Sequence, residues 1–214
     1  MDFSTRQLDR RTLLRAVKVL GAQDQDLGKI VTLYGPPPLW KREEGFHTLI
    51  HIILEQQVSL ASAKAAYVRL VEALRVLTPE NFLKLDDEEL KTIGFSRQKT
   101  RYGRNLAEAV IQGALDPESL GTLEDAEVRS RLMSLKGIGA WTADIYLLMA
   151  LGRPDIWPTG DLALAVAVQQ LKQMSHRPTT QALADLSEDW RPWRAVAARI
   201  LWHFYLSVTP RKST

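Results

Sequence analysis

Apolar residues recur at the spacing of an α-helix along almost the whole chain. Leu13, Val17 and Leu20 lie on one face of a first predicted helix, because they are four and three residues apart. Three consecutive prolines at 36–38 interrupt the series, since proline is excluded from a helix interior. No stretch alternates between apolar and polar residues as a half-buried strand does, so the pattern predicts an all-α fold. The later predicted helices span 27–34, 46–56, 59–77, two short segments opened by TPENF and DDEEL, one segment after Gly94, and then 124–135, 140–151, 161–174, 179–186 and 192–208.

The bulk composition narrows the class of protein without identifying it. A chain of 214 residues with 45% hydrophobic and 25% charged residues is long enough to fold around one large or two small cores. The net charge is +3 and the isoelectric point about 9.2, which permits a polyanionic partner without requiring one. The absence of cysteine excludes disulfides, a catalytic thiol and a cysteine-ligated iron–sulfur cluster. The apolar runs are far shorter than the roughly 20 residues of a membrane helix, so we expect no membrane association.

The stretch LKGIGAW, residues 135–141, predicts a tight turn between two helices. Gly137 and Gly139 tolerate backbone conformations and close approaches that residues with a β-carbon resist. If the turn exposes the free N–H groups at the start of the following helix, it forms an anion site that suits a DNA phosphate. A turn that binds nothing is an equally good interpretation of these glycines alone, because glycine often ends helices.

Asp161 stands at the head of an apolar run, directly after WPTG. A carboxylate in this position is often only a helix cap. A functional role gains weight because the glycine turn lies about 20 residues upstream and Trp141 opens the helix that follows it. The six tryptophans are expected to be mostly core, with one or two lining a pocket for a flat ring. His51 and Glu55 are one helical turn apart, which indicates a helix-surface pair more often than a metal site.

Three segments together resemble the helix–hairpin–helix DNA glycosylases: FHTLIHIILEQQVSLASAKAAYVRL, LKGIGAWTAD and DIWPTGDLAL. Within that superfamily the chain is similar to the monofunctional 3-methyladenine DNA glycosylase II group, which repairs alkylated DNA. The resemblance runs from about Phe46 to Leu206 and fits the compact members, which lack an extra β-rich domain. It implies two helical lobes around a DNA-binding cleft. Residues 46–152 would form a central lobe with the hairpin, and residues 1–45 plus 153–214 a second lobe that carries the catalytic aspartate.

The resemblance also assigns roles to single residues. Asp161 falls on the catalytic aspartate, and Trp141 occupies the position of the Schiff-base lysine of bifunctional members, so no lyase step by that route is expected. Gln57 matches the residue that fills the gap left by a flipped nucleotide. The implied sets are a base pocket of Trp141, Trp202, Ile145 and Leu162, a DNA-binding group of Gln57, Lys136, Gly137, Gly139 and Ala140, and the backbone carbonyls of Met133, Leu135 and Ile138 around a monovalent cation, Na⁺ or K⁺.

The expected function is therefore excision of alkylated purines, of the 3-methyladenine and 7-methylguanine type, from duplex DNA in base excision repair. Two alternatives stay open: a non-catalytic helix–hairpin–helix DNA-binding module, and a glycosylase for a different lesion. We expect no cofactor for catalysis, no iron–sulfur cluster, double-stranded DNA as the partner and a monomeric protein. The expected location is the cytoplasm at the nucleoid in a bacterium, or the nucleus in a eukaryote.

Overall fold

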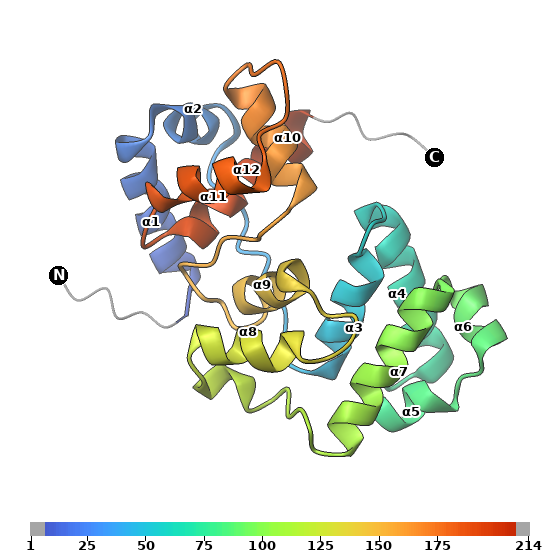
Figure 1. Cartoon of the computed structure of the whole chain (residues 1–214). Coiled ribbons are helices and arrows are strands. Elements are labelled where there is room, and N and C mark those ends of the chain that lie inside the picture. The colour runs from blue at the N-terminus through green and yellow to red at the C-terminus, as the bar shows by residue number, and fades with distance from the viewer. Residues whose placement is uncertain (1–6, 209–214) are drawn as a thin grey trace. The chain divides into compact units, whose positions relative to one another are not determined.

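The computed structural model describes residues 7–208, and this range is helical without β-strands, which confirms the predicted all-α class (Figure 1). The chain forms two compact units, a first unit of residues 1–41 and 152–214 and a second unit of residues 42–151. Both ends of the predicted second lobe, residues 1–6 and 209–214, lie outside the described residues. Within residues 7–208, no helix has the combination of length and apolar character needed to span a bilayer.

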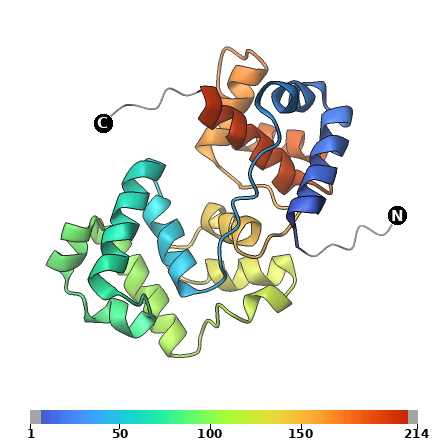
Figure 2. The ribbon, with the colours of Figure 1, turned by 180° about the vertical axis from the view of Figure 1, so that it is seen from behind.

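The first unit is built around its last helix, α12. Its residues from Ala195 to Trp202 are all buried, as expected for a helix that is enclosed by others rather than covering a surface. α12 contacts the other helices of the unit, and Figure 2 shows it beside α1 and α2. The helices of this unit are α1 (Arg10–Gln23), α2 (Gln25–Tyr34), α10 (Leu162–Leu171), α11 (Thr180–Glu188) and α12 (Arg194–Val208).

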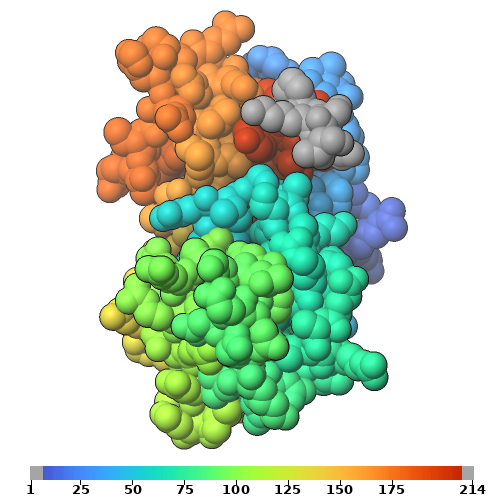
Figure 3. All heavy atoms as spheres, turned by 90° about the vertical axis from the view of Figure 1, so that its right-hand side faces the viewer, coloured from blue at the N-terminus to red at the C-terminus, as the bar shows by residue number. Residues whose placement is uncertain are grey.

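In the second unit, α3 is the buried centre and packs against α4, α7 and α9. α5 and α7 approach closely at Gly103, where an added β-carbon would lie 2.6 Å from the ring of Phe82. Atoms of the segment from α4 to α7, cyan to green, form a continuous surface in Figure 3. The elements of this unit are α3 (Phe46–Glu55), α4 (Leu60–Leu74), α5 (Pro79–Lys84), α6 (Asp87–Ile93), α7 (Arg97–Ile111), the short 3₁₀ helix η1 (Leu120–Thr122), α8 (Asp125–Met133) and α9 (Ala140–Met149).

The units divide close to the predicted lobe boundaries but not at them. The first change of unit comes after residue 41 rather than 45, and the second after 151 rather than 152. Arg42 accounts for the earlier start, because its N–H donates to the carbonyl of Met149 at 2.9 Å and its guanidinium binds both carboxylate oxygens of Glu55 at 2.6 and 3.0 Å. These bonds fix Arg42 to the second unit before α3 begins.

The predicted helices exist, and their ends differ for local reasons. The helix predicted over 59–77 begins after Ser59, whose hydroxyl caps it, and ends at Leu74 because Arg75 takes a positive φ of 58°. The helix predicted over 161–174 likewise begins after its cap, Asp161, and ends at Leu171. Polar residues at predicted helix starts thus act mainly as caps that precede the first turn.

Candidate functional site

The predicted hairpin joins α8 to α9 in the second unit. Gly137 takes a φ of +106°, in the region that favours glycine, and an added β-carbon would lie 2.1 Å from the Cγ of Tyr102 on α7. The hairpin also hydrogen-bonds internally, since the N–H of Ile138 donates to the carbonyl of Leu135 at 3.1 Å. Ile138 itself is buried and anchors the turn. Gly137 is therefore required by the fold itself.

Gly139 differs from Gly137 in that its backbone conformation does not require glycine. Its φ of −94° and ψ of −179° are extended backbone that any residue adopts, and no atom lies within 4 Å of a β-carbon built there. The residue is exposed. Nothing inside the protein requires glycine at 139, so only close approach by a ligand would require it.

α9 begins at the hairpin without a side-chain cap on its N-terminal N–H groups. Several other helices do have such caps, among them α4, where Ser59 accepts the N–H of Ser62. The first N–H groups of a helix lack partners within the helix and carry partial positive charge, so this end favours an anion. Lys136 beside it is exposed, and Ala140 opens the helix half-buried. A phosphate-binding role for this end of α9 and Lys136 stays a prediction.

Gln56 connects the hairpin to the turn that carries Gln57. Its amide nitrogen donates to the carbonyl of Gly137 and to the hydroxyl of Thr142, both at 3.0 Å. Gln57, the next residue, is exposed and has a φ of +56°, a conformation that costs a residue with a β-carbon roughly 1–2 kcal/mol. The α3–α4 turn thus presents Gln57 in a strained conformation, and Gln56 fixes this turn to the hairpin. Gln56 could not be identified from the sequence, because its partners lie 81 and 86 residues away.

Trp141 is half-buried at the start of α9, whereas Ile145, one turn later, is fully buried in the second unit. Other tryptophans are core residues as expected: Trp157 and Trp190 pack with ring centroids 5.4 Å apart, and Trp193 is buried. Part of the Trp141 side chain is therefore accessible to solvent, unlike the side chains of the buried tryptophans.

Asp161 is the N-cap of α10 in the first unit, and it is only 8% exposed. Its Oδ1 accepts the N–H of Leu164 at 2.9 Å and the indole N–H of Trp202, from α12, at 3.1 Å. Trp202 is buried, so this bond fixes the orientation of the carboxylate. The capping interpretation of Asp161 is correct, but a second contact across 41 residues shows that capping is not its whole environment.

A second aspartate in the same unit repeats this arrangement. Asp24 caps α2 through its Oδ1, which accepts the N–H groups of Asp26 and Leu27, and its Oδ2 accepts the indole N–H of Trp190 at 2.9 Å. An aspartate that caps a helix and binds an indole is thus a structural device of this unit. Asp161 in addition lines a pocket.

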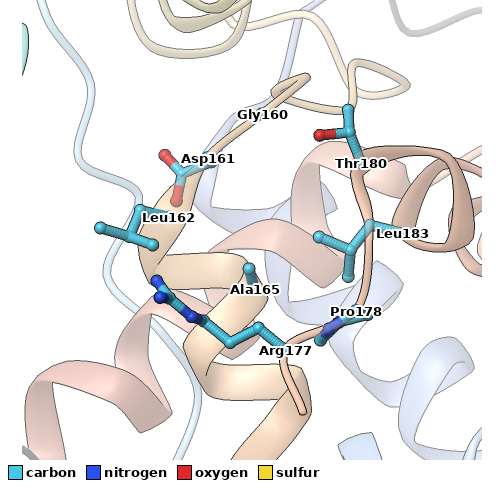
Figure 4. Close-up of a pocket in the computed structure, with 8 residues that line it drawn as sticks. All are labelled: Gly160, Asp161, Leu162, Ala165, Arg177, Pro178, Thr180 and Leu183. Atoms are coloured by element: carbon cyan, nitrogen blue, oxygen red, sulfur yellow. The ribbon is translucent and has the colours of Figure 1, made fainter.

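The pocket beside Asp161 has a volume of about 210 Å³ and lies entirely within the first unit (Figure 4). Leu162, predicted in the base pocket, lines it and is 61% exposed, which is unusual for a leucine at the start of a buried helix. The structure therefore brings Asp161, Leu162 and Trp202 together in the first unit. The predicted residues of the second unit gather at the hairpin and the α3–α4 turn.

The pair formed by His51 and Glu55 does not lie on the helix surface as expected. The Glu55 side chain is 7% exposed and is bound by Arg42 at 2.6 Å, while His51 Nε2 lies 3.8 Å from Glu55. The His51 ring stacks on Tyr67 at 4.1 Å, and burial lowers its pKa. This cluster stabilises the α3–α4 packing. Among residues 7–208, no group of three or more His, Cys, Asp or Glu side chains is arranged to hold a metal ion.

Comparison with known proteins places the chain among DNA repair proteins. The family model for HhH-GPD superfamily base excision DNA repair proteins matches residues 50–192. The DNA-3-methyladenine glycosylase 1 of Schizosaccharomyces pombe is 29% identical over 209 residues, which cover 94% of this chain and 92% of that protein. A putative DNA-3-methyladenine glycosylase of Bacillus subtilis, YfjP, is 27% identical over 165 residues, and the matched part covers 73% of this chain and 58% of that protein's length.

The fold is similar as well. The structure of the S. pombe 3-methyladenine DNA glycosylase Mag1 in complex with abasic DNA superposes with a TM-score of 0.81 at 29% identity, covering 88% of this chain and 95% of that one. The match includes both the hairpin and Asp161, since both lie inside residues 50–192. The resemblance inferred from the sequence is thereby confirmed, and the chain belongs to the HhH-GPD superfamily of base excision DNA repair proteins.

Proposed function

We propose that this protein is a monofunctional DNA glycosylase that excises alkylated purines, of the 3-methyladenine and 7-methylguanine type, from duplex DNA. The observation that carries the proposal is Asp161: a buried carboxylate held by an indole N–H at the edge of a pocket. The relatives named as DNA-3-methyladenine glycosylases support the substrate class.

DNA is held through its phosphates at the hairpin. The uncapped N–H groups of α9 and the exposed charge of Lys136 favour a phosphate oxygen, and exposed Gly139 allows the backbone of a ligand to approach. Such contacts carry no sequence information, which suits an enzyme that must act on damage in any sequence.

The target nucleotide has to leave the stack before its glycosidic bond becomes accessible, at a cost of a few kcal/mol. Gln57 fills the gap that it leaves. Its exposed side chain and positive φ support this role, because a strained conformation at an exposed turn persists only where the surrounding structure fixes it. Gln56 supplies that fixation through its bonds to the hairpin.

The chemistry at Asp161 follows from the charge of the substrate. A purine alkylated at N3 or N7 is cationic and leaves as a neutral base when the C1′–N bond breaks, taking the bonding electrons. The positive charge that develops on the deoxyribose is stabilised by the Asp161 carboxylate, water adds to C1′, and its proton is released. One carboxylate suffices, because this leaving group needs little help from a general acid.

The residue at position 141 determines whether a lyase step can follow base excision, and here it is a tryptophan. An indole cannot form a Schiff base with the sugar, so no lyase step follows from this position. The half-buried ring instead stacks on the flipped base, and a cationic purine adds an attraction of ~0.5–2 kcal/mol over a tryptophan face. In the first unit, Trp202 and Leu162 lie beside Asp161 and are the proposed base-pocket residues there, whereas Ile145 is buried in the core of the second unit and is no longer proposed to contact the base.

A monovalent cation at the hairpin is part of the proposal. Carbonyl oxygen is the ligand type that hard cations prefer. The carbonyl of Leu135 accepts one hydrogen bond and keeps a second lone pair, and that of Met133 belongs to the last turn of α8, where carbonyls lack partners within the helix. These residues and Ile138 fit a Na⁺ or K⁺ ion, which would supply charge to a bound phosphate.

The test is incubation of the protein with methylated duplex DNA, followed by chromatography of the released bases and measurement of abasic sites. Release of 3-methyladenine without strand cleavage and without a borohydride-trapped covalent complex is the expected result. DNA binding with no base released from a panel of lesions would identify a binding module instead. Release of uracil or an oxidised base alone would identify a different substrate.

A further inference from the structure

The pocket beside Asp161 carries both signs of charge. The residues that line it include the charged Asp161 and Arg177, the polar Thr180, and the apolar Leu162 and Leu183. Its volume of about 210 Å³ is smaller than the roughly 300–1,000 Å³ of typical small-molecule sites. The pocket therefore suits one charged group of a larger ligand better than a whole nucleotide.

Arg177 is the unusual member of this lining. It is exposed, and within residues 7–208 it has no hydrogen-bond or ion-pair partner. Arg191 and Arg194, in the same unit, each form ion pairs with both Asp155 and Glu188. Figure 4 shows the Arg177 side chain running back along α10, with its guanidinium on the side of Leu162. The five N–H donors of this group are thus available in the pocket of the proposed catalytic carboxylate.

Thr180 adds a hydroxyl to the same pocket. Its neighbour Thr179 is the cap of α11, because the Thr179 hydroxyl accepts the N–H of Ala182 at 3.1 Å. Thr180 is not used in this way, and Figure 4 shows its hydroxyl on the side of Gly160 and Asp161. A guanidinium together with a hydroxyl is a typical donor set for a phosphate group.

We propose that Arg177 and Thr180 bind a phosphodiester group that flanks the target nucleotide, and that this contact holds the deoxyribose at Asp161. The proposal rests on the proposed function, because it takes Asp161 as the group that faces the sugar. Asp161 alone would repel the phosphates on either side of the sugar. A pocket with a carboxylate and a guanidinium matches a nucleotide in the transition state, which has a positive sugar and a negative phosphate.

The experiment combines a variant of the protein with a variant of the DNA. Arg177→Gln is compared with the wild type on three lesion duplexes: one unmodified, one with a neutral methylphosphonate on the 5′ side of the target nucleotide and one with it on the 3′ side. Arg191→Gln is the matched control, because it removes the same charge from an exposed arginine of the same unit that is already paired with carboxylates. Thermal unfolding verifies that the variants are folded.

Arg177→Gln should weaken binding of the unmodified duplex about tenfold or more and make the dependence of log Kd on log salt concentration shallower by about one. One of the two methylphosphonates should weaken duplex binding by the wild type by a similar factor and should leave duplex binding by Arg177→Gln unchanged. Arg191→Gln should stay sensitive to that methylphosphonate.

Additive losses from Arg177→Gln and both methylphosphonates would overturn the proposal, as would binding of Arg177→Gln equal to that of the wild type. The wild type is assayed for base release on the unmodified duplex in parallel. A wild type that binds but releases no base contradicts the proposed function, whereas a wild type that releases base while Arg177→Gln behaves like Arg191→Gln contradicts only the phosphate site.

Discussion

Single residues in the hairpin should respond differently to the same change. Gly137→Ala should destabilise the fold by about 1–3 kcal/mol, because its β-carbon would lie 2.1 Å from Tyr102 at a φ of +106°. Gly139→Ala should cost at most about 1 kcal/mol, since only a slightly poorer cap results. It should nevertheless weaken binding to duplexes of unrelated sequence by the same factor. Thermal unfolding and titrations with two such duplexes measure both effects, and unchanged or sequence-selective binding by Gly139→Ala would argue against a phosphate contact there.

Trp141 should contribute more to substrate preference than to stability. Because its ring is half-buried, Trp141→Ala should cost less than the ~3–5 kcal/mol typical of a fully buried aromatic residue. Excision of cationic 3-methyladenine should fall more than excision of a neutral base such as hypoxanthine, if the enzyme accepts both. The measurement is the single-turnover rate on each lesion at a temperature where the variant is folded. Equal losses on the two bases would indicate a purely structural role.

Tyr146 links two loops of the second unit and should make the free energy of unfolding depend on pH in the alkaline range. Its hydroxyl accepts the N–H of Gly45 at 3.0 Å and donates to the carbonyl of Pro117 at 3.2 Å, and burial raises its pKa to about 12. The unfolded chain loses this proton near pH 10 while the folded protein keeps it, so stability is complete below pH 10 and falls as the pH rises toward 12. Urea denaturation between pH 9 and 12 should therefore show a shallower decline for Tyr146→Phe than for the wild type. Parallel declines would exclude this contribution.

At the scale of elements, Gln56 should act as the link between the α3–α4 turn and the hairpin. Gln56→Leu keeps a side chain of similar size but removes two hydrogen bonds at 3.0 Å and leaves the hydroxyl of buried Thr142 without this donor. We expect a loss of about 1–3 kcal/mol in stability and a slower appearance of the fluorescence of a flipped 2-aminopurine. Gln181→Leu is a suitable control, because Gln181 is exposed and its amide donates to Asp185 on the same helix, away from the hairpin and the α3–α4 turn in the chain. If Gln56→Leu flips the base at the wild-type rate, Gln56 does not couple the α3–α4 turn to the hairpin during flipping.

Helices, caps and the family were predictable from the sequence because they depend on neighbours a few residues apart or on quoted motifs. Asp161 and the hairpin were found in this way. The bond of Gln56 to Gly137 and the bond of Trp202 to Asp161 were not, since they join parts of the chain that are 81 and 41 residues apart. The exposed position expected for Glu55 was wrong for the same reason: the helical pattern does not show that Arg42, outside the helix, covers it.

At the scale of the whole molecule, the proposed reaction draws on two units with separate internal support. Gln56 and Tyr102 fix the hairpin and Gln57 within the second unit, whereas Trp202 and the start of α10 fix Asp161 within the first. Changes at the hairpin should therefore affect DNA binding without altering the environment of the carboxylate. Changes at Asp161 should affect the chemical step without altering DNA binding.

The central claim is that Asp161 acts on the substrate and does not only cap α10. Asp161→Asn removes the charge but keeps an oxygen that can accept from both Leu164 and Trp202, and asparagine caps helices as well as aspartate, so the cap and the indole bond should persist. Asp24→Asn makes the same change at another aspartate of this unit that caps a helix and binds an indole.

The most direct measurement is the single-turnover rate of 3-methyladenine release by the two variants, with the affinity for the lesion duplex measured alongside. Asp161→Asn should lower the rate roughly 100-fold or more at nearly unchanged affinity, while Asp24→Asn should release base at the wild-type rate wherever it is folded. Base release by Asp161→Asn at a rate near that of Asp24→Asn would contradict the account, because both aspartates would then be caps only.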